Sequence, residues 1–495
     1  MLSKEEIVKS VPQTGFFGQP KGLLSLFFTE FWERFSYYGM RAILIYYMYY
    51  EVTQGGLGLE RSTANSIMAV YGSLVYMSGI IGGWIADRLF GTTRTVFYGG
   101  VLIMIGHIVL AFPGGLTTLF ISMAFIIIGT GLLKSNISTI VGDLYSAEDA
   151  RRDSGFSIFY MGINMGAFIA PLIVGTIGLE YNFHLGFGLA AVGMAIGLVV
   201  FLLTKKKYLG LAGSYVPNPL TKEGKKKFFT RLAIAVVVIA ALGFYLIQAG
   251  IMTINVFTMT ISILGILIPT LYFIIMYRSD KSTEDEKSRL LAYIPLFVAA
   301  MMFWAIQEQG SNILAQYADE RVDLTLGSFE ISPAWFQSLN PLFIIALAPV
   351  FAWLWVKLGN RQPSTPRKFA YGLFFAGLSF VVMIFPAYFN GTDTLANPMW
   401  LVLSFFLVVL GELLLSPVGL SATTKLAPAA FAAQTMSLWF MTNASAQAIN
   451  AQVVKLYKPE TEIMYFGVIG AIAIGLGLIL YVMTPLIQKY MRGIR

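Results

Sequence analysis

The chain has 495 residues, of which 57% are hydrophobic and 12% are charged. Soluble domains carry about 25% charged residues, so the composition excludes an ordinary soluble globular protein. The absence of cysteine excludes disulfides, thiolate metal sites and cysteine nucleophiles. The net charge of +8 requires no nucleic-acid partner, because the distribution of the basic residues along the chain accounts for it.

Apolar runs of about 20 residues recur along the chain, and each can cross a bilayer core of ~30 Å as a helix. We expect residues 1–21 to be a cytoplasmic segment rather than a cleavable signal peptide. Six transmembrane helices are predicted after it, at 22–50, 62–88, 94–112, 116–143, 153–179 and 183–204. A basic linker leads to two more apolar helices, at 230–249 and 254–277. A charged linker then leads to six further helices, at 290–318, 333–356, 367–389, 397–424, 429–453 and 463–488.

The basic residues test this topology. With the N-terminus in the cytoplasm, most of the 34 Lys and Arg residues fall in cytoplasmic segments. The outer loops hold Arg61, Arg321, Lys455 and Lys458. This asymmetry follows the positive-inside rule, so we expect a cell-membrane protein with an even number of spans and both termini in the cytoplasm.

The order of six, two and six helices predicts an all-α polytopic membrane protein with fourteen transmembrane helices. Two six-helix bundles, 22–204 and 290–488, would flank a linker, 205–289, that carries two extra helices, and a cytoplasmic tail would occupy 489–495. Two related bundles around a central site resemble the major facilitator plan. The loop 83–94, GWIADRLFGTTR, resembles the cytoplasmic-loop motif of that superfamily. The extra helices hold no buried charge, so we expect them outside the transport path.

Seven charged residues fall inside the predicted helices rather than at their ends. They are Glu30, Glu33, Arg34, Arg41, Lys134, Glu308 and Glu412. Each costs roughly 2.5–3.5 kcal/mol at the centre of a membrane helix on insertion scales, so such residues pair with one another or face water. The acidic residues exceed the basic ones by one. One carboxylate must therefore be protonated or be balanced by a substrate amine or a mobile proton.

Polar residues of the first helix share one face at ~100° per residue. This stripe consists of Glu30, Glu33, Arg34, Tyr37, Tyr38 and Arg41. Glu30 and Arg34 have the i, i+4 spacing that favours an ion pair. A stripe of this kind can serve only to bind neighbouring helices, but buried charges on four different helices favour a functional role.

Lys134 and Glu308 belong to different predicted bundles. An ion pair between them would hold the bundles together on one face, and protonation of Glu308 would break it. We therefore hypothesise that proton and substrate arrival exchange ion pairs while the two bundles rock.

The residues near these charges suit a zwitterionic substrate with variable side chains. Arg41 and Lys134 would bind a carboxylate, because Arg offers a bidentate fork. Glu412 would bind an ammonium group, and asparagines would bind an amide. The polar and aromatic candidates are Asn164, Asn340, Ser416, Tyr38, Tyr76, Trp304 and Trp439. Trp and Tyr are also common at membrane interfaces, so an interfacial role stays open for Tyr76 and Trp439.

Motifs in several helices point to one family. Residues 29–39 are TEFWERFSYYG, residues 159–166 are FYMGINMG, residues 304–309 are WAIQEQ, and residues 411–419 are GELLLSPVG. Together with Asn340-Pro341, these stretches resemble the proton-dependent oligopeptide transporter family, whose first helix has an ExxER signature followed by two tyrosines. The likeness extends over the twelve helices of the family plan, and the central helix pair is typical of bacterial members.

The resemblance implies symport of di- and tripeptides with protons. It assigns proton coupling to Glu30, Glu33, Arg34 and Glu308. It places the peptide carboxylate at Arg41 and Lys134, and the amino end at Asn340 and Glu412. It places the peptide backbone at Asn164 and the side-chain pockets at Tyr38, Tyr76, Trp304 and Trp439.

Two departures from the family pattern matter. Members often have Lys-Pro-Asn where this chain has Lys134-Ser135-Asn136, so the local helix shape is open. The chain also lacks the helix 2 histidine of animal members, and we expect His107 to be a packed, hydrogen-bonded residue. Proton coupling would then rest on carboxylates.

Other functions stay open on the residues alone. A drug–proton antiporter also uses buried carboxylates, although Arg41 and Lys134 opposed by Glu412 favour a zwitterion. Anion transport occurs in the family, and Glu412 disfavours it. A membrane-embedded enzyme would need a catalytic His, Ser–Lys or Asp–Asp group, which the buried charges do not form convincingly. We expect no enzymatic activity, no metal or cofactor, no nucleic-acid partner, and a monomer in the lipid bilayer driven by the proton gradient.

Overall fold

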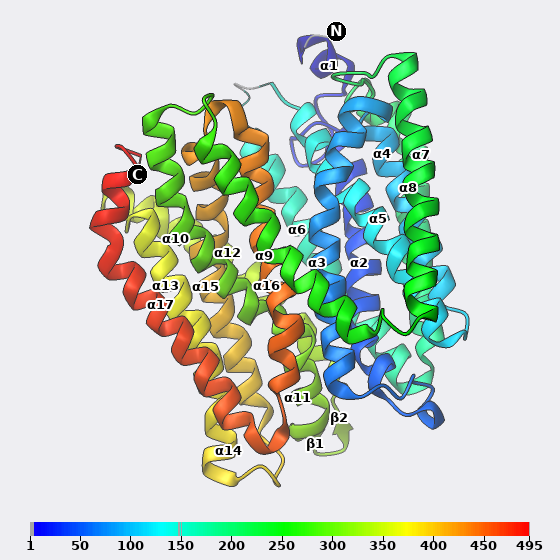
Figure 1. Cartoon of the computed structure of the whole chain (residues 1–495), viewed down its shortest axis with the longest axis vertical. Coiled ribbons are helices and arrows are strands. Elements are labelled where there is room, and N and C mark those ends of the chain that lie inside the picture. The colour runs from blue at the N-terminus through cyan, green and yellow to red at the C-terminus, as the bar shows by residue number, and fades with distance from the viewer. Residues whose placement is uncertain (1–3, 147–148, 150, 495) are drawn as a thin grey trace. The chain divides into compact units, whose positions relative to one another are not determined.

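The structure is a computed structural model that describes residues 4–146, 149 and 151–494, and within them all side chains except those of residues 4, 80, 153, 360 and 432–434. The first three residues of the predicted N-terminal segment and the last residue of the predicted tail lie outside the described part. Nearly all of the described chain is helical (Figure 1).

A helix lies at each of the fourteen positions predicted for a transmembrane span. The first eight are α2 (Gly22–Tyr49), α3 (Arg61–Ile85), α4 (Thr92–Leu110), α5 (Gly115–Asp143), α6 (Arg152–Ala170), α7 (Phe183–Thr204), α8 (Lys222–Gln248) and α9 (Ile254–Arg278). The later helices are α10 (Glu284–Gln307), α11 (Ile313–Arg321), α12 (Leu339–Leu358), α13 (Thr365–Val381), α14 (Phe385–Asn390), α15 (Pro398–Leu426), α16 (Ala432–Val453) and α17 (Glu462–Tyr490). A short helix α1 (Lys4–Ser10) precedes them, and strands β1 (Thr325–Leu326) and β2 (Phe329–Glu330) form an antiparallel hairpin after α11. The predicted all-α polytopic fold class is confirmed.

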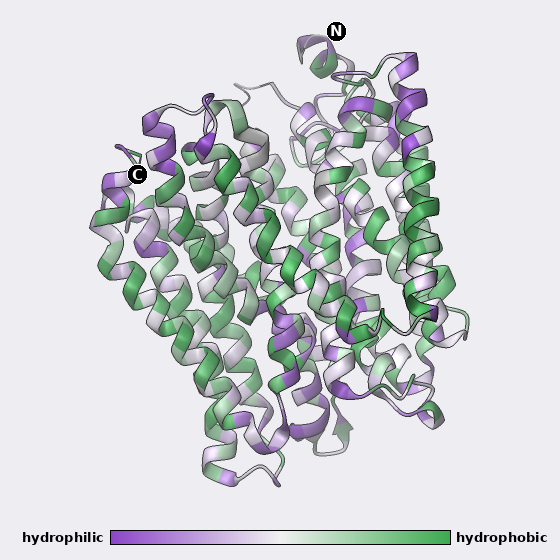
Figure 2. Ribbon diagram, viewed as in Figure 1, coloured by the Kyte–Doolittle hydropathy of each residue, from purple (hydrophilic) through white to green (hydrophobic). Residues whose placement is uncertain are grey.

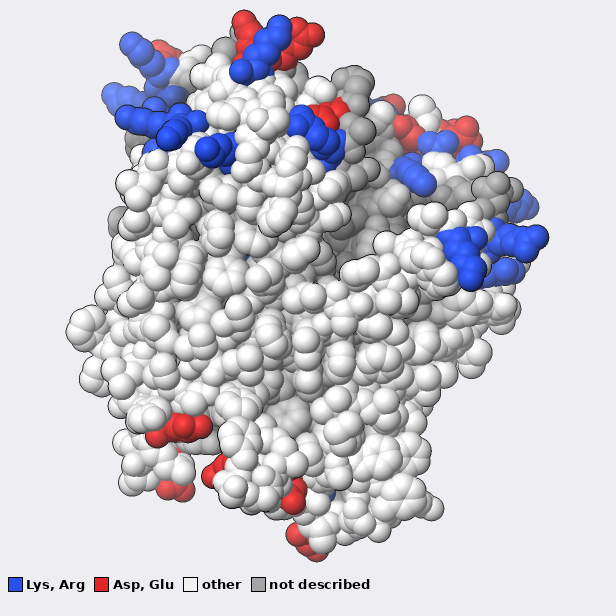
Figure 3. Space-filling model, turned by 180° about the vertical axis from the view of Figure 1, so that it is seen from behind, with Lys and Arg blue, Asp and Glu red and all other residues white. Residues whose placement is uncertain are grey.

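Most of these helices are apolar enough for a bilayer. Within the described residues, twelve helical stretches combine the length and the composition of a membrane span. Helices α2 and α16 are also long, but charged residues in α2 and amide and hydroxyl residues in α16 make them more polar. Figure 3 shows that broad areas of the described surface are white and carry no charged side chains. The two polar helices carry much of the candidate site.

Two predicted helices are interrupted in the structure, which corrects the sequence-based boundaries. The span predicted at 290–318 is split into α10 and α11 by a tight turn, Glu308–Ser311. Asn312 follows with φ −127° and ψ −79°, and its side chain accepts a hydrogen bond from the Ile313 amide at 2.6 Å, which caps the new helix. The span predicted at 367–389 likewise consists of α13, a turn and α14. Glu308 therefore lies at a break in the helix rather than in its middle.

The chain forms two compact units. The first unit comprises residues 1–40 and 77–260, and the second comprises residues 41–76 and 261–495. The unit boundaries lie within α2, α3 and α9. The predicted division into bundles at 204 and 290 stays a prediction.

Close backbone contacts hold the first unit together. A Cβ atom on Gly99 of α4 would lie 2.7 Å from the carbonyl oxygen of Gly129 in α5, so only glycine permits this approach. Gly166 of α6 similarly lies against the backbone of Phe31 in α2. This contact fixes α2, which carries the polar stripe, against α6.

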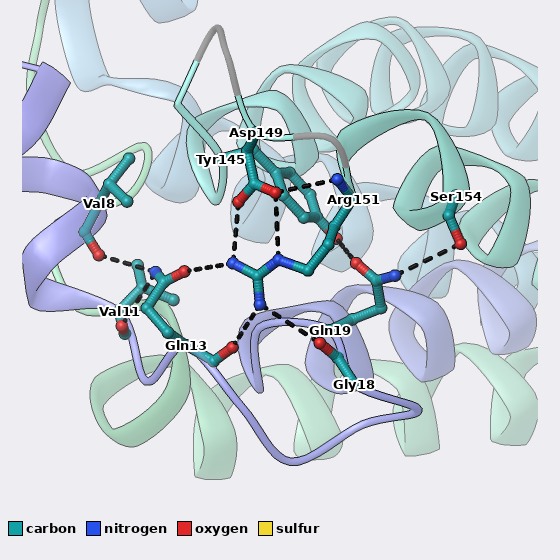
Figure 4. A network of polar contacts seen from close by, with 9 residues as sticks. All are labelled: Val8, Val11, Gln13, Gly18, Gln19, Tyr145, Asp149, Arg151 and Ser154. Carbon is teal, nitrogen blue, oxygen red and sulfur yellow. Dashed lines mark hydrogen bonds and ion pairs between the residues drawn. The ribbon is translucent and has the colours of Figure 1, made fainter.

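The N-terminal segment is also bound to the first unit (Figure 4). Ile7 and Val11 are buried in its apolar core. The Arg151 guanidinium donates to the Gln13 carbonyl at 2.8 Å, to the Gly18 carbonyl at 3.2 Å and to the Gln13 side chain at 3.0 Å. It also pairs with Asp149 at 2.8 Å. Arg151 thus joins the segment before α2 to the connection between α5 and α6.

The extra helix α8 differs from its neighbours because none of its described residues is buried. Figure 2 shows it hydrophobic over most of its length, with a hydrophilic start at its lysines. Helix α9 does pack within the second unit, where Ser262 donates to the Ala448 carbonyl of α16 at 2.6 Å. The expectation that both helices lie outside the transport path stays a prediction.

In the second unit, small and hydroxyl residues bring the polar helix α16 close to α3. Ser66 of α3 donates to the Ala451 carbonyl at 2.6 Å, and Ser73 donates to the Ala444 carbonyl at 2.8 Å. A Cβ atom on Gly72 would lie 2.6 Å from the side-chain nitrogen of Gln447. These contacts position the polar face of α16.

Candidate functional site

The polar stripe of α2 contains a buried charged triad in the first unit. Arg34 Nε lies 2.8 Å from Glu30 Oε1 and 2.8 Å from Glu33 Oε2, and the predicted Glu30–Arg34 pair is confirmed. All three side chains are almost completely buried. Lys134 of α5 is half-buried and lies close enough to Glu33 for electrostatic attraction.

Glu33 is the less satisfied carboxylate of the triad. Its contact with Arg34 is not aligned as a hydrogen bond, and neither of its oxygens has a hydrogen-bond donor among the described residues. A buried carboxylate without donors is costly, and binding a proton removes that cost.

Aromatic rings extend the stripe of α2 beyond the triad. The Arg34 guanidinium lies over the Tyr37 ring at 5.9 Å, and the rings of Tyr37 and Tyr38 meet edge to face at 5.3 Å. Tyr38 is half-buried. Asn164 of α6 is buried, and its side chain donates to the Tyr160 carbonyl of its own helix at 3.0 Å.

Glu308 is the centre of a second polar cluster, in the second unit. Arg41 of α2 forms a short ion pair with Glu308 Oε2. Gln447 and Asn443 of α16 donate to the same carboxylate at 2.7 Å and 3.0 Å, and the Tyr76 hydroxyl of α3 donates at 3.3 Å. The Glu308 side chain is only 5% exposed. Hydrogen bonds and an ion pair from three helices thus stabilise its negative charge.

Glu412 of α15 is a further buried carboxylate of the second unit. Asn340 of α12 donates to Glu412 Oε2 at 3.1 Å, as expected of two residues predicted to bind one end of a substrate. Glu412 lies close enough to Glu308 for their charges to repel each other. Ser416 follows one helical turn later and is half-buried.

The two predicted tryptophans lie on helices that also carry the Glu308 cluster. Trp304 is half-buried and lies one helical turn before Glu308. Trp439 of α16 is buried, lies one turn before Asn443, and packs against Gly419 and against the Phe369 ring at 6.4 Å between ring centroids. Gly419 is required here because any Cβ would overlap the indole ring.

The structure therefore brings the predicted residues together in two groups. The group in the first unit contains Glu30, Glu33, Arg34, Tyr38 and Lys134. The group in the second unit contains Arg41, Tyr76, Glu308, Asn340 and Glu412. The roles of these residues in proton or substrate binding stay predictions, as does the Lys134–Glu308 pair, which would join the two units.

The sequence analysis missed several polar residues. Asn443 and Gln447 bind Glu308 directly, and their signal was two amides spaced by four residues in a membrane helix. Arg321 and Glu462 form a bidentate ion pair at 2.9 Å and 3.0 Å with almost no exposure. Both were assigned to loops or helix ends, where charges are usually solvated. The expected hydrogen bond of His107 is wrong, since this buried ring has no partner among the described residues.

Comparison with known proteins assigns the family. Residues 93–472 match the POT family, PTR2. The di-/tripeptide transporter of Lactococcus lactis subsp. cremoris is 50% identical over 488 residues, which cover 97% of this chain and 98% of that protein. A crystal structure of the peptide transporter POT in complex with sulfate is 67% identical, with a TM-score of 0.97 and 100% coverage of both chains. A POT family transporter in complex with a thioalcohol-conjugated peptide is 50% identical, with a TM-score of 0.93 over 97% of this chain and 99% of that one. The chain is therefore a member of the POT family and has the major facilitator fold.

Proposed function

We propose that this protein is a proton-coupled symporter that imports di- and tripeptides across the cell membrane by alternating access. The observation that carries the proposal is the cluster around Glu308, a buried carboxylate whose charge is balanced by Arg41. Such a group can exchange its cation for a proton without leaving the membrane interior. The relative from Lactococcus lactis, named as a di-/tripeptide transporter, supports the substrate class.

The proton would act at Glu308 and Glu33. Protonation of Glu308 removes the charge that holds Arg41, so the guanidinium becomes available to a peptide carboxylate, which it can bind through two parallel hydrogen bonds. Glu33 has no hydrogen-bond donor in the described part of the chain, so it would accept a proton readily while Arg34 stays paired with Glu30. Lys134 would then be released from Glu33 to join Arg41 at the peptide carboxylate.

The ammonium group, the backbone and the side chains of the peptide would bind to other residues. Glu412 is ionisable and bound by a neutral amide, so a substrate ammonium group would supply the missing cation. Asn164 would hold the peptide backbone. Tyr38, Tyr76, Trp304 and Trp439 would contact the variable side chains, because aromatic surfaces accept both apolar groups and cations. Ser416 would add a hydroxyl near the amino end.

The proposed topology has both termini in the cytoplasm. The positive-inside rule supports it, because the Lys-rich linkers and both terminal segments then lie on the cytoplasmic side. We further propose that the protein works as a monomer without a cofactor, since the proton gradient supplies the energy.

Transport by the purified protein in liposomes tests the function. We expect an inward proton gradient to drive accumulation of a labelled dipeptide, and an unlabelled dipeptide gradient to drive proton uptake. Exchange of dipeptide without a gradient should also occur. Proton-driven efflux of cationic drugs without peptide exchange would favour an antiporter instead, and uptake of nitrate alone would favour an anion carrier.

A further inference from the structure

The two amides of α16 that bind Glu308 have unused hydrogen-bonding capacity. Asn443 is 5% exposed and Gln447 is 1% exposed. Each uses its NH2 group to donate to the Glu308 carboxylate. Within the described part of the chain, Asn443 Oδ1 and Gln447 Oε1 are buried and have no hydrogen-bond partner.

An unpartnered buried acceptor destabilises the fold, because it has lost its hydrogen bonds with water and gained none in the protein. Leucine or methionine could fill the same volumes without this cost. Two such acceptors beside one titratable carboxylate therefore suggest that a donor is present in another state of the molecule. The donor closest at hand is the O–H group that Glu308 itself gains when it is protonated.

The other groups that face Glu308 are less suited to accept a hydrogen bond from its protonated form. Arg41 has only donors. Glu412 Oε2 of α15 already accepts a hydrogen bond from Asn340. Tyr76 has a hydroxyl that can accept, but it lies at 3.3 Å, longer than either amide contact. Gln309, the neighbour of Glu308, already binds Tyr465 and Asn450.

We propose that Asn443 and Gln447 are positioning residues that bind Glu308 in both of its protonation states. Their NH2 groups donate to the carboxylate when Glu308 is paired with Arg41. When Glu308 is protonated, an amide rotates about its terminal bond, and its oxygen accepts a hydrogen bond from the carboxylic acid. The amides thus keep Glu308 in place while Arg41 leaves.

The amide of Gln447 packs closely against α3. The residue opposite its amide is Gly72, where a Cβ atom would lie 2.6 Å from the amide nitrogen. Glycine at position 72 therefore permits the Gln447 amide to lie where it donates to Glu308. A Gly72→Ala substitution should displace this amide without removing any polar group.

The inference rests on the proposed proton-coupled function, and its test separates the two. Wild-type protein in liposomes must first show dipeptide-driven proton uptake, and its absence would contradict the proposed function itself. The variants Asn443→Leu and Gln447→Met are then compared for the pH dependence of dipeptide uptake. Two amide NH2 groups stabilise the carboxylate, whereas one amide oxygen stabilises the acid, so the loss of an amide favours the protonated form. We therefore expect the pH of half-maximal uptake to rise by about one unit. The KM for dipeptide exchange should change by less than about threefold.

Asn450→Leu is the matched control. Asn450 is a buried amide two turns from Asn443 on the same helix, and it binds the Ala305 carbonyl rather than Glu308. We expect this variant to retain the wild-type pH midpoint even if it is less stable. In a Glu308→Gln background, Asn443→Leu should no longer alter the pH dependence of exchange. An equal shift in that background, or no shift in either amide variant, would overturn the proposal.

Infrared difference spectroscopy tests the acceptor role directly. Acidification of the wild type should produce a carboxylic acid carbonyl band that disappears in Glu308→Gln. The same acidification should shift a side-chain amide carbonyl band that disappears in Asn443→Leu or Gln447→Met. A carboxylic acid band without an accompanying amide change would show that the two residues act only as donors, which would contradict the proposal.

Discussion

The second unit contains two buried arginine–glutamate pairs whose surroundings differ. Glu308 is bound by Arg41 and by neutral side chains, namely Tyr76, Asn443 and Gln447. Glu462 is bound by Arg321 through two parallel hydrogen bonds. The remaining N–H groups of Arg321 donate to backbone carbonyls of the loop before α15, at Thr394 and Gly391.

This difference shows that the neighbours of an ion pair determine whether it can open. When Glu308 loses its charge, amide and hydroxyl groups remain to bind it, so the cost of separating Arg41 is partly offset. Separating Arg321 would leave a charged guanidinium among backbone carbonyls and an isolated carboxylate at the start of α17. Removing one partner of such a buried pair typically costs about 3–5 kcal/mol. The first pair is suited to exchange and the second to holding helices together.

Removing the titratable group of the first pair should have the largest effect. We expect Glu308→Gln to reduce proton-driven dipeptide accumulation to the level of empty liposomes, while dipeptide exchange continues. The glutamine keeps a similar shape but leaves Arg41 without its counter-charge, so we also expect a lower thermal midpoint, and uptake is compared at equal amounts of folded protein. Uptake into liposomes with and without a pH gradient measures the first outcome. Accumulation at the wild-type level would show that Glu308 is not the coupling residue.

The second pair should affect stability rather than coupling. We expect Arg321→Ala to lower the free energy of unfolding by about 3–5 kcal/mol, because Glu462 is left buried and unpaired. Thermal unfolding of the detergent-purified protein measures the loss. The double variant Arg321→Met with Glu462→Leu should recover most of it, since no charge is then buried. The properly folded fraction should retain the wild-type ratio of proton-driven uptake to exchange.

Local spacing explains which parts of this arrangement could be predicted. The Glu30–Arg34 pair follows from an i, i+4 spacing, and the helix positions follow from apolar runs. Lys134 is the partner that the sequence suggests for Glu308, whereas the structure pairs Glu308 with Arg41. Both residues lie far from Glu308 in sequence, so local spacing does not identify the partner. The helix break at Asn312 could not be predicted, because it depends on a side-chain cap and no proline marks the position. Arg321 and Glu462 were missed because helix ends usually expose their charges.

Glu412 offers an intermediate case, a buried carboxylate bound by an amide and, among the described residues, in no ion pair. We expect Asn340→Leu to raise the KM for dipeptides about tenfold, equivalent to about 1.4 kcal/mol, because the carboxylate loses its orienting hydrogen bond. A peptide without a free amino group should be affected less. Exchange kinetics with both peptides measure the ratio. An equal effect on both would place Asn340 away from the amino end.

The smallest effect is expected at a third arginine–carboxylate pair, which is partly exposed. Arg151 hydrogen bonds hold the pKa of Asp149 below its ordinary value of 3.8. A lowered pKa means that the folded state favours the carboxylate, so the pair contributes stability above about pH 3.8 and loses it as the pH falls through the lower, folded-state pKa. Because the Arg151 side chain is 35% exposed and that of Asp149 is 15% exposed, solvent screening limits this contribution to about 0.5 kcal/mol.

The consequence of that small energy is local, because Arg151 binds the backbone before α2 at Gln13 and Gly18. We expect Asp149→Asn to increase hydrogen exchange in residues 11–19 about twofold at neutral pH, and leave the exchange of α16 unchanged. Acidification of the wild type through the lowered pKa of Asp149 should approach the variant's behaviour, whereas the variant itself should show no further change from this pair. If the segment exchanged equally in both proteins, the carbonyl contacts of Arg151 would suffice without Asp149. The exposed pair would then differ from the two buried ones in kind, because its carboxylate would not be needed to orient the arginine.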